Sequence, residues 1–219
     1  MYHYYQRSEH DAWFLLSYKA GEDPVVLAKA QGAKKLTILA LNQIVDDGTD
    51  AEIPRNRDRI GYRGPLYFDI DCKDDLGQAI SSAQELVGKL MRMGVPKGAI
   101  KIYLSGSKGL HILVDELLFA GSRPFLRLPE IYKEMARDLF VIGLDYSVYS
   151  SGRGNSFRIV NLQRHDGNFR VPVTPDELAE LTVDRYREWV KAPRTVEVED
   201  PQGQVVYELK ALFEEAKKR

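Results

Sequence analysis

The sequence predicts an α+β fold, in which hairpins occur together with strand–helix–strand crossovers. Three observations lead to this class. Residues 66–71 (LYFDID) have a strand pattern and are followed by an amphipathic helix pattern over 75–93. Two further strand patterns, 101–104 and 111–114, are separated only by a Gly/Ser loop, as in a hairpin. A second helix pattern opens at Pro129, so strands and helices alternate along the chain.

Composition excludes some classes of function. The chain has 219 residues, with 31 Lys and Arg against 32 Asp and Glu, which gives a formal net charge of -1. A protein that coats nucleic acid or anionic membrane needs a large positive excess, so that class is excluded, whereas a local basic groove is not. The length suits one sizeable domain with its own core.

Cysteine and histidine usage argues against a zinc site and a disulfide. Cys72 is the single cysteine, so neither an intrachain disulfide nor a Cys-based zinc site is expected. The histidines lack the i, i+4 pairing of a zinc helix; they are His3, His10, His111 and His165. No apolar run approaches the ~20 residues that cross a bilayer, and the start does not resemble a signal peptide. We therefore expect a cytoplasmic protein in a reducing compartment, with no membrane partner.

The chain is expected to form one domain with three parts: an N-terminal α/β part (1–64), a motif-bearing core (65–178) and a C-terminal helical segment (179–219). Residues 36–41 (LTILAL) fit a strand or a short buried helix equally well. A polar stretch precedes the strand at 66–71 and carries four arginines, which belong either to a solvated surface or to a functional one: Arg55, Arg57, Arg59 and Arg63.

Helix and strand signals continue after residue 65. Ala79, Ala83, Leu86, Leu90 and Met93 recur at helical spacing, and Gly94 is placed to end that helix. The helix that opens at Pro129 ends near Gly143, and a further helix begins at Thr174. Short strands are predicted at 147–150, 157–160, 169–173 and near Val196, and a charged helix is predicted after Gly203.

The first motif with chemical potential is Asp69-Ile70-Asp71. In a strand, residues i and i+2 point to the same face, ~6.5–7 Å apart along the chain. Two carboxylates held together repel unless cations bridge them, and Mg²⁺ or Mn²⁺ are the natural partners of oxygen ligands. The alternative is an ordinary strand with a solvated polar face.

The second motif is the loop from Ser105 to His111 (SGSKGLH). Its glycines let backbone amides approach an anion, and four of its side chains can donate to phosphate oxygens: Ser105, Ser107, Lys108 and His111. It does not have the spacing of the Walker-type phosphate loop. The alternative is a hairpin turn with a polar tip.

The third motif lies between 144 and 175. Asp145 precedes a strand pattern and offers a third carboxylate, for which Asp138 and Asp166 compete. Arg158 lies in a strand pattern, where its guanidinium can face a fixed anion. The stretch is locally cationic because it also contains Arg153, Arg164 and Arg170; the alternative is a basic hairpin surface.

In this order the motifs resemble those of the archaeo-eukaryotic primase superfamily. A hydrophobic-Asp-hydrophobic-Asp strand corresponds to Phe68 to Asp71, an S-x-x-x-G-x-H element to Ser105 to His111, and a later Asp to Leu144-Asp145. The segment 155–173, which ends in Val171-Pro172-Val173, is similar to the family's region after the third motif. The resemblance covers 66–178, about half of the chain.

The resemblance implies a primase catalytic core: an RRM-like mixed sheet with flanking helices and a smaller N-terminal α/β unit. It implies template-directed nucleotidyl transfer, with two Mg²⁺ or Mn²⁺ ions on Asp69, Asp71 and Asp145. The incoming NTP or dNTP would contact Ser105, Ser107, Lys108, His111 and Arg158. Single-stranded DNA template and primer would contact Arg55, Arg57, Arg59, Arg63 and Arg153. A helicase or other replication domain, on this chain or another, is a further partner that the resemblance implies.

One feature departs from the family. Many primase small subunits carry a zinc-binding element, which a single cysteine does not allow in Cys-rich form. The chain is more similar to the primase-polymerases of plasmids, phages and mobile elements, or to the polymerase domain of bacterial repair ligases. Three alternatives to a primase stay open: a repair polymerase that only extends primers, a non-catalytic RRM-like nucleic-acid-binding module, and a metal-dependent nuclease.

Overall fold

The computed structural model describes residues 1–8, 12–43, 60–150, 155–197 and 204–219. Its strands are β1 (Tyr2–Gln6), β2 (Phe14–Ser17), β3 (Lys35–Thr37), β4 (Ala40–Gln43), β5 (Ile60–Arg63), β6 (Leu66–Asp71), β7 (Ile100–Leu104), β8 (Gly109–Val114), β9 (Phe125–Leu126), β10 (Ser156–Arg158) and β11 (Val171–Val173). Its α-helices are α1 (Pro24–Ala30), α2 (Leu76–Arg92), α3 (Leu128–Asp138), α4 (Pro175–Ala179), α5 (Val183–Trp189) and α6 (Tyr207–Ala216). Short 3-10 helices include η4 (Tyr146–Tyr149).

These elements form two sheets, which confirms the α+β class. The four-stranded sheet has the order β11-β7-β8-β6, and the seven-stranded sheet has the order β10-β3-β1-β4-β5-β9, with β2 on the other edge of β1. Among the described residues, all pairings between named strands are antiparallel, so the four-stranded sheet is not mixed as expected. The crossover through α2 does make β6 and β7 parallel to each other, but β8 lies between them and is antiparallel to both.

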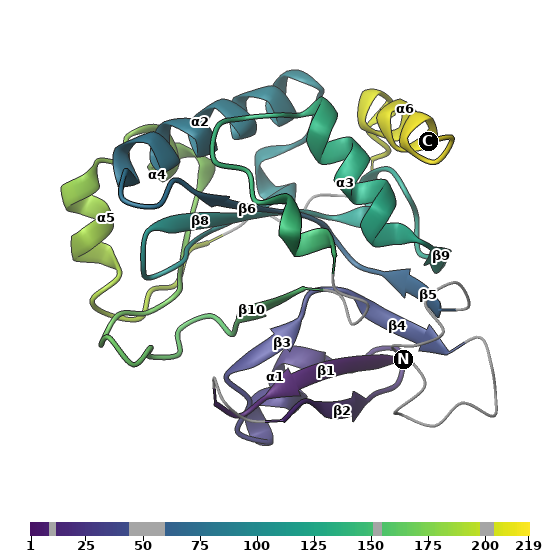
Figure 1. Ribbon diagram of the computed structural model, residues 1–219, viewed down its shortest axis with the longest axis horizontal. Helices are drawn as coiled ribbons and strands as arrows, with labels where there is room; N and C mark the ends of the chain where they lie inside the picture. The colour runs from purple at the N-terminus through teal and green to yellow at the C-terminus, as the bar shows by residue number, and fades with distance from the viewer. Residues whose placement is uncertain (9–11, 44–59, 151–154, 198–203) are drawn as a thin grey trace.

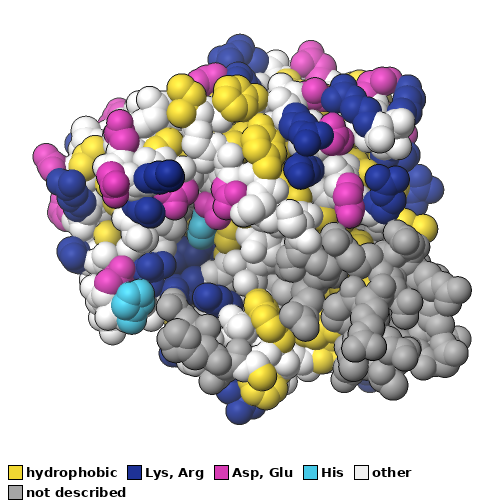
Figure 2. All heavy atoms as spheres, in the orientation of Figure 1, with side chains coloured by type: hydrophobic (Ala, Val, Ile, Leu, Met, Phe, Trp, Pro, Cys, Tyr) yellow, Lys and Arg dark blue, Asp and Glu magenta, His cyan; other side chains and the backbone are white. Residues whose placement is uncertain are grey.

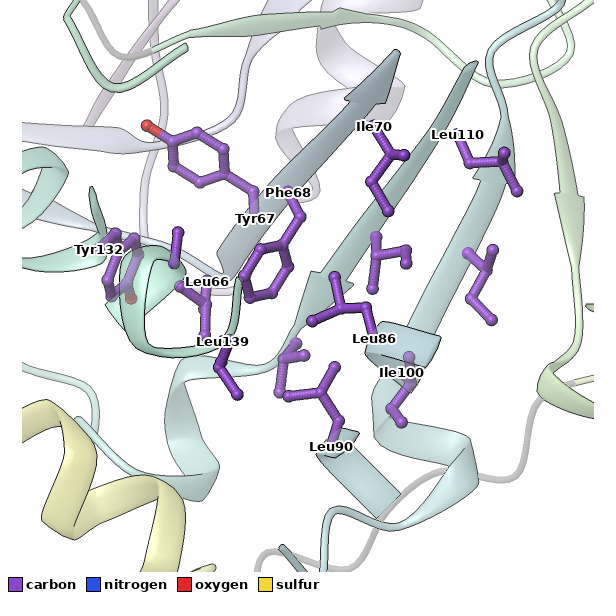
Figure 3. Packing of buried hydrophobic residues seen from close by; sticks show 14 of the residues in the cluster. Leu66, Tyr67, Phe68, Ile70, Leu86, Leu90, Ile100, Leu110, Tyr132 and Leu139 are labelled. Atoms are coloured by element: carbon purple, nitrogen blue, oxygen red, sulfur yellow. The ribbon is translucent and has the colours of Figure 1, made fainter. Parts of the chain in front are cut away.

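The alternation in β6 decides which face of the four-stranded sheet carries the acidic residues. Leu66, Phe68 and Ile70 are fully buried and pack on the side of α2, where Figure 3 shows Leu86 and Leu90 beside them. Tyr67 points the opposite way, and Asp69 and Asp71 follow it at two-residue steps. Because the apolar side chains of β6 are buried against α2, both carboxylates lie on the opposite face of the sheet.

The layers in Figure 1 place that second face toward the N-terminal sheet. Helices α2 and α3 cover one side of the sheet that contains β6 and β8, and strands β1 to β4 lie on its other side. Strand β10 pairs with β3, so residues late in the chain extend the N-terminal sheet. The acidic face of one sheet and the β3–β10 edge of the other therefore look into the same space.

Most of the predicted elements are confirmed, with small shifts of their ends. Helix α2 begins after Asp75, whose side chain caps it, and Thr174 forms a capping box with Glu177 at the start of α4. Within residues 36–41, Leu36 and Thr37 end β3, Ala40 and Leu41 begin β4, and the two residues between them form a bend. Both strands pair with β1, one after the other along its edge. Among the described residues of the first sixty, β1, β2 and α1 were not predicted.

Two strand predictions are wrong. Residues 147–150 lie in and just after the 3-10 helix η4, because the Asp145 side chain accepts from the Ser147 N–H and turns the chain. Val196 lies in no strand: the nearby backbone of Arg194 exchanges hydrogen bonds with the side chain of Asn161 instead of with a neighbouring strand. Within the described ranges, no helix has the length and apolar character to span a membrane.

Candidate active site

The edge of β6 brings a third carboxylate beside the first two. Residues 143–145 run along that edge: the Asp71 N–H donates to the Gly143 carbonyl at 2.9 Å, and the Asp145 N–H donates to the Asp69 carbonyl at 3.0 Å. Ile70 and Leu144 form an isolated antiparallel bridge between these two hydrogen bonds. The main chain thus places Asp145 next to Asp69, as the three-motif prediction requires.

Gly143 allows this close approach. Its φ is +81°, and a Cβ at this position would lie 2.3 Å from the Cys72 Sγ and 3.3 Å from the Asp71 carbonyl oxygen. Both the left-handed backbone and the space exclude a larger residue. The glycine that was predicted only to end a helix therefore also seats the third carboxylate.

The three carboxylates influence one another. Burial, followed by the charges of Asp145 and Asp71, raises the pKa of Asp69 to about 7, and Arg170 opposes this shift. Asp71 accepts from the Lys73 N–H at 2.7 Å and lies 4.0 Å from the Lys108 ammonium. Asp145 accepts from the N–H and the hydroxyl of Ser147, each at 2.8 Å. The cluster concentrates negative charge that a cation would offset.

The competing acids are engaged elsewhere. Asp138 forms an ion pair with Arg219 at 2.9 Å, and Asp166 forms one with Arg164 at 3.2 Å. Arg164 and its loop also lower the pKa of Asp166 from its ordinary value. The alternatives for the third carboxylate therefore have their own cationic partners, which leaves Asp145 as the best placed of the three.

The loop between β7 and β8 is held in shape by hydrogen bonds of Ser105 and of Tyr186 on α5. The Ser105 oxygen accepts from the N–H groups of Ser107 (3.3 Å) and Gly109 (3.2 Å), and its hydroxyl lies 3.3 Å from that of Tyr186. Tyr186 on α5 donates to the Gly109 carbonyl at 2.8 Å, so the Ser105 hydroxyl is left to donate to Tyr186. Ser105 consequently shapes the loop, and the exposed Ser107 and Lys108 are the side chains free to reach outward.

His111 lies on β8 directly opposite Asp69, with which it pairs across the sheet. Its ring stacks on Phe157 at 3.8 Å with an interplanar angle of 4°, and its Nε2 lies 3.7 Å from an Asp69 oxygen. Burial and the positive charges of Arg170 and Arg164 lower the pKa of His111 well below its ordinary value. These surroundings favour the neutral form of the imidazole.

These groups share one cleft of about 420 Å³. Figure 2 shows a hollow on this face in which a histidine lies between acidic side chains on one side and Lys and Arg side chains on the other. All the predicted metal and nucleotide residues line the cleft: Asp69, Asp71, Asp145, Ser105, Ser107, Lys108, His111 and Arg158. Two sheets supply them, since Arg158 belongs to β10 and the others to β6, β8 and their flanking loops.

The cleft also contains residues that were not among the predicted contacts: Lys35, Ser147, Asn155, Ser156 and Arg164. Lys35 pairs with Arg158 across β3 and β10, so the two cations lie next to each other. Arg164 belongs to the stretch that was noted as locally cationic, and that charge run is the sequence signal that identifies it. Lys35 has no such signal, because its position depends on pairing with a distant strand.

None of the predicted template residues is found to line the acidic cleft among the residues that the structure describes. Arg63 lies at the end of β5, pairs with Glu116 at 3.4 Å and lines a second cavity rather than the acidic cleft. Phe157 and Arg158 line both cavities and stand between them. Arg55, Arg57, Arg59 and Arg153 lie outside the described residues.

The three carboxylates are oxygen donors of the kind that divalent metal ions prefer, and they lie on adjacent stretches of backbone. Burial raises the pKa of Asp69, and the negative charges of Asp145 and Asp71 add to this shift. In the part of the chain that the structure describes, no three His, Cys, Asp or Glu side chains converge closely enough to hold an ion as they stand. Asp71 and Asp145 instead accept local hydrogen bonds from the Lys73 N–H and the Ser147 hydroxyl.

Comparison with known proteins gives limited information. No family model and no curated protein matches the chain. Its backbone is similar to that of the polymerase domain of Mycobacterium tuberculosis Ligase D in complex with DNA, with a TM-score of 0.47 and 15% sequence identity over 96% of this chain and 84% of that chain. These values are too low to transfer a function from one protein to the other.

Proposed function

We propose that this chain is a template-directed nucleotidyltransferase, a DNA primase or primase-polymerase that joins NTPs or dNTPs and releases pyrophosphate. The observation that carries the proposal is the composition of the cleft. Three carboxylates face a set of phosphate-binding donors across one space, and the donors come from elements far apart in sequence. This combination suits a reaction in which a polyanionic triphosphate is attacked beside bound metal ions.

Asp69, Asp71 and Asp145 would hold two Mg²⁺ or Mn²⁺ ions, which supply a lowered pKa for the attacking 3′ hydroxyl and a counter-charge for the phosphates. Lys108 and Arg158 are cations in the cleft, and they would bind the triphosphate of the incoming nucleotide. Ser107 would add a hydroxyl donor and His111 an N–H donor. His111, which is stacked on Phe157, and the buried Arg158 are held in place by the fold, so they would stabilise charge in the transition state with little reorganisation.

A non-catalytic RRM-like module is the less favoured alternative. Such a module binds bases on exposed aromatic side chains. Here Tyr67 and Phe68 are fully buried, and the Arg170 guanidinium lies 3.8 Å from the ring centre of Tyr103 and covers it. The aromatic residues that could form a stacking platform on this sheet are therefore occupied.

The decisive experiment is a primer-synthesis assay on single-stranded DNA with labelled NTPs or dNTPs, in Mg²⁺ and in Mn²⁺. We expect the wild type to incorporate nucleotide and Asp69→Asn with Asp71→Asn to lose roughly a hundredfold or more of that activity. Asp74→Asn is the matched control, since Asp74 is an exposed acid just beyond the strand. Incorporation by the folded double variant, or none by the wild type with either metal, contradicts the proposal.

The same assay separates the related activities. Products from a bare template indicate priming, whereas products only from an annealed primer indicate an extension polymerase of the kind used in end joining. Shortening of the labelled DNA without incorporation indicates a nuclease. Metal-independent binding with no chemistry indicates the RRM-like module.

A further inference from the structure

The guanidinium of Arg170 is buried beside the cleft without lining it. Arg170 precedes β11 and is only 7% exposed. Its Nη1 donates to the Arg158 carbonyl at 2.8 Å, its Nε donates to the His111 Nδ1 at 3.1 Å, and its charge lies over the Tyr103 ring. Among the described residues, no carboxylate lies within ion-pair distance of it. Burying a guanidinium without a carboxylate partner reduces the stability of the fold, because the charge loses its hydration. We therefore ask what its hydrogen bonds do to the groups that hold it.

The contact with His111 fixes the position of the imidazole proton. A guanidinium has only donors, so the Nδ1 that receives its hydrogen bond carries no proton. The neutral ring must then be protonated at Nε2, the nitrogen that lies 3.7 Å from the Asp69 oxygen and faces the cleft. Stacking on Phe157 holds the ring plane, and Arg170 sets which edge of the ring faces the cleft.

We propose that Arg170 is a positioning residue that orients His111 and holds it in the Nε2–H tautomer, so that this N–H donates to a phosphate oxygen of the incoming nucleotide. The proposal rests on the proposed function for the identity of the acceptor. Arg170 lines the second cavity, together with Phe157 and Arg158, but not the acidic cleft, so it would act on the incoming nucleotide through His111. Tyr103 supports the Arg170 guanidinium through a cation–π contact at 3.8 Å from its ring centre, and the Phe157 ring centre lies 5.2 Å away.

The first test needs no substrate. Nitrogen-15 spectra of the labelled full-length wild type at neutral pH should show His111 with an unprotonated Nδ1 and a protonated Nε2. In Arg170→Met, which keeps the bulk beneath Tyr103 but has no donor, the two tautomers should mix. A protonated Nδ1 in the wild type, or unchanged shifts in the folded Arg170→Met protein, overturns the proposal.

The second test is kinetic. Loss of the orienting hydrogen bond in Arg170→Met should raise KM for nucleotide roughly tenfold and leave kcat within about threefold. Arg170→Lys, which keeps a donor, should recover part of the loss, and Arg187→Met on the exposed surface of α5 should cause none. Because Arg170 acts through His111, adding His111→Ala to Arg170→Met should cost no more than His111→Ala alone.

Losses that add in the double variant, or an unchanged KM in Arg170→Met, overturn the positioning role. If the wild type incorporates no nucleotide at all, the proposed function falls. The nitrogen shifts of His111 and their dependence on Arg170 then still decide whether Arg170 sets the tautomer.

Discussion

The backbone N–H of Asp145 donates to the carbonyl oxygen of Asp69 at 3.0 Å. The third carboxylate of the candidate site is therefore placed by main-chain pairing, as one more short strand would be. This arrangement ties the acidic cluster to the edge of β6. It also means that small backbone displacements at residues 143–145 disturb the cluster more than conservative changes of neighbouring side chains.

The first prediction concerns Gly143→Ala. The added Cβ would meet the Cys72 Sγ at 2.3 Å, and the backbone at φ +81° disfavours any side chain. We expect residues 143–145 to shift, with nucleotide incorporation reduced at least about tenfold and a loss of stability above the ~1 kcal/mol that the positive φ alone explains. Chemical unfolding and the incorporation assay measure the two effects.

Gly167→Ala is the matched control, because Gly167 has φ +83° and nothing within 4 Å of the added Cβ. It should lose stability without losing activity beyond its folded fraction. In a Cys72→Ala background the penalty of Gly143→Ala should shrink toward that of Gly167→Ala. Equal effects of the two glycine substitutions on activity would refute the role assigned to Gly143.

The second prediction concerns the support of the β7–β8 loop. The Tyr186 hydroxyl donates to the Gly109 carbonyl at 2.8 Å and lies beside the Ser105 hydroxyl. Tyr186→Phe removes both contacts from a buried position, so we expect a loss of about 1–2 kcal/mol of stability and a severalfold rise in KM for nucleotide. Tyr207→Phe, at an 80% exposed tyrosine, should change neither quantity. A normal KM in folded Tyr186→Phe would mean that the loop keeps its shape without this tyrosine.

The sequence predicted the parts of this site that local patterns determine. The alternation in 66–71 placed Asp69 and Asp71 on one face because Phe68 and Ile70 had to face the helix. The Gly/Ser loop and its hairpin followed from composition over a few residues. The sequence around Thr174 and Glu177 predicted the start of a helix, and in the structure these two residues form a capping box there.

Other parts depend on pairings between distant strands, which no local pattern encodes. Lys35 enters the cleft only because β3 pairs with β10, and Arg170 reaches His111 only because β11 lies beside β7. The strand predicted at 147–150 failed because the side chain of Asp145 competes for the backbone N–H of Ser147. In each case a tertiary or side-chain contact overrode what the neighbouring sequence favoured.

The third prediction separates template binding from nucleotide binding. Arg63 and Arg158 lie in different surroundings, since Arg63 lines the second cavity, where it pairs with Glu116, but not the acidic cleft, whereas Arg158 lines both. If Arg63 contacts template phosphate, Arg63→Gln should reduce the salt dependence of single-stranded DNA affinity by about one in the log–log slope. KM for nucleotide should stay within about twofold, whereas Arg158→Gln should raise it.

Glu116→Gln provides the converse test. It releases Arg63 from its carboxylate partner, so DNA affinity at low salt should rise while the slope is kept. An unchanged slope in Arg63→Gln would return Arg63 to a structural ion pair and leave the template surface to other residues.

The fourth prediction is a loss of stability in acid that originates far from the cleft, at His3. This side chain is buried in β1, its Nδ1 lies 3.1 Å from the Thr37 hydroxyl, and burial lowers its pKa to about 4. The unfolded chain binds a proton below the ordinary pKa of 6.5, whereas the folded chain resists protonation down to the lowered value. Stability from the neutral ring is therefore complete above that ordinary pKa and is lost as the pH falls toward the lowered one. We expect roughly 3 kcal/mol less stability at about pH 4 than at about pH 7.5 from this group.

Urea unfolding of the wild type and of His3→Gln at both pH values measures this difference. The His3→Gln variant should lack this part of the pH dependence, and His165→Gln, at an exposed histidine, should retain it. An equal pH dependence in His3→Gln and the wild type would show that other groups cause the acid sensitivity.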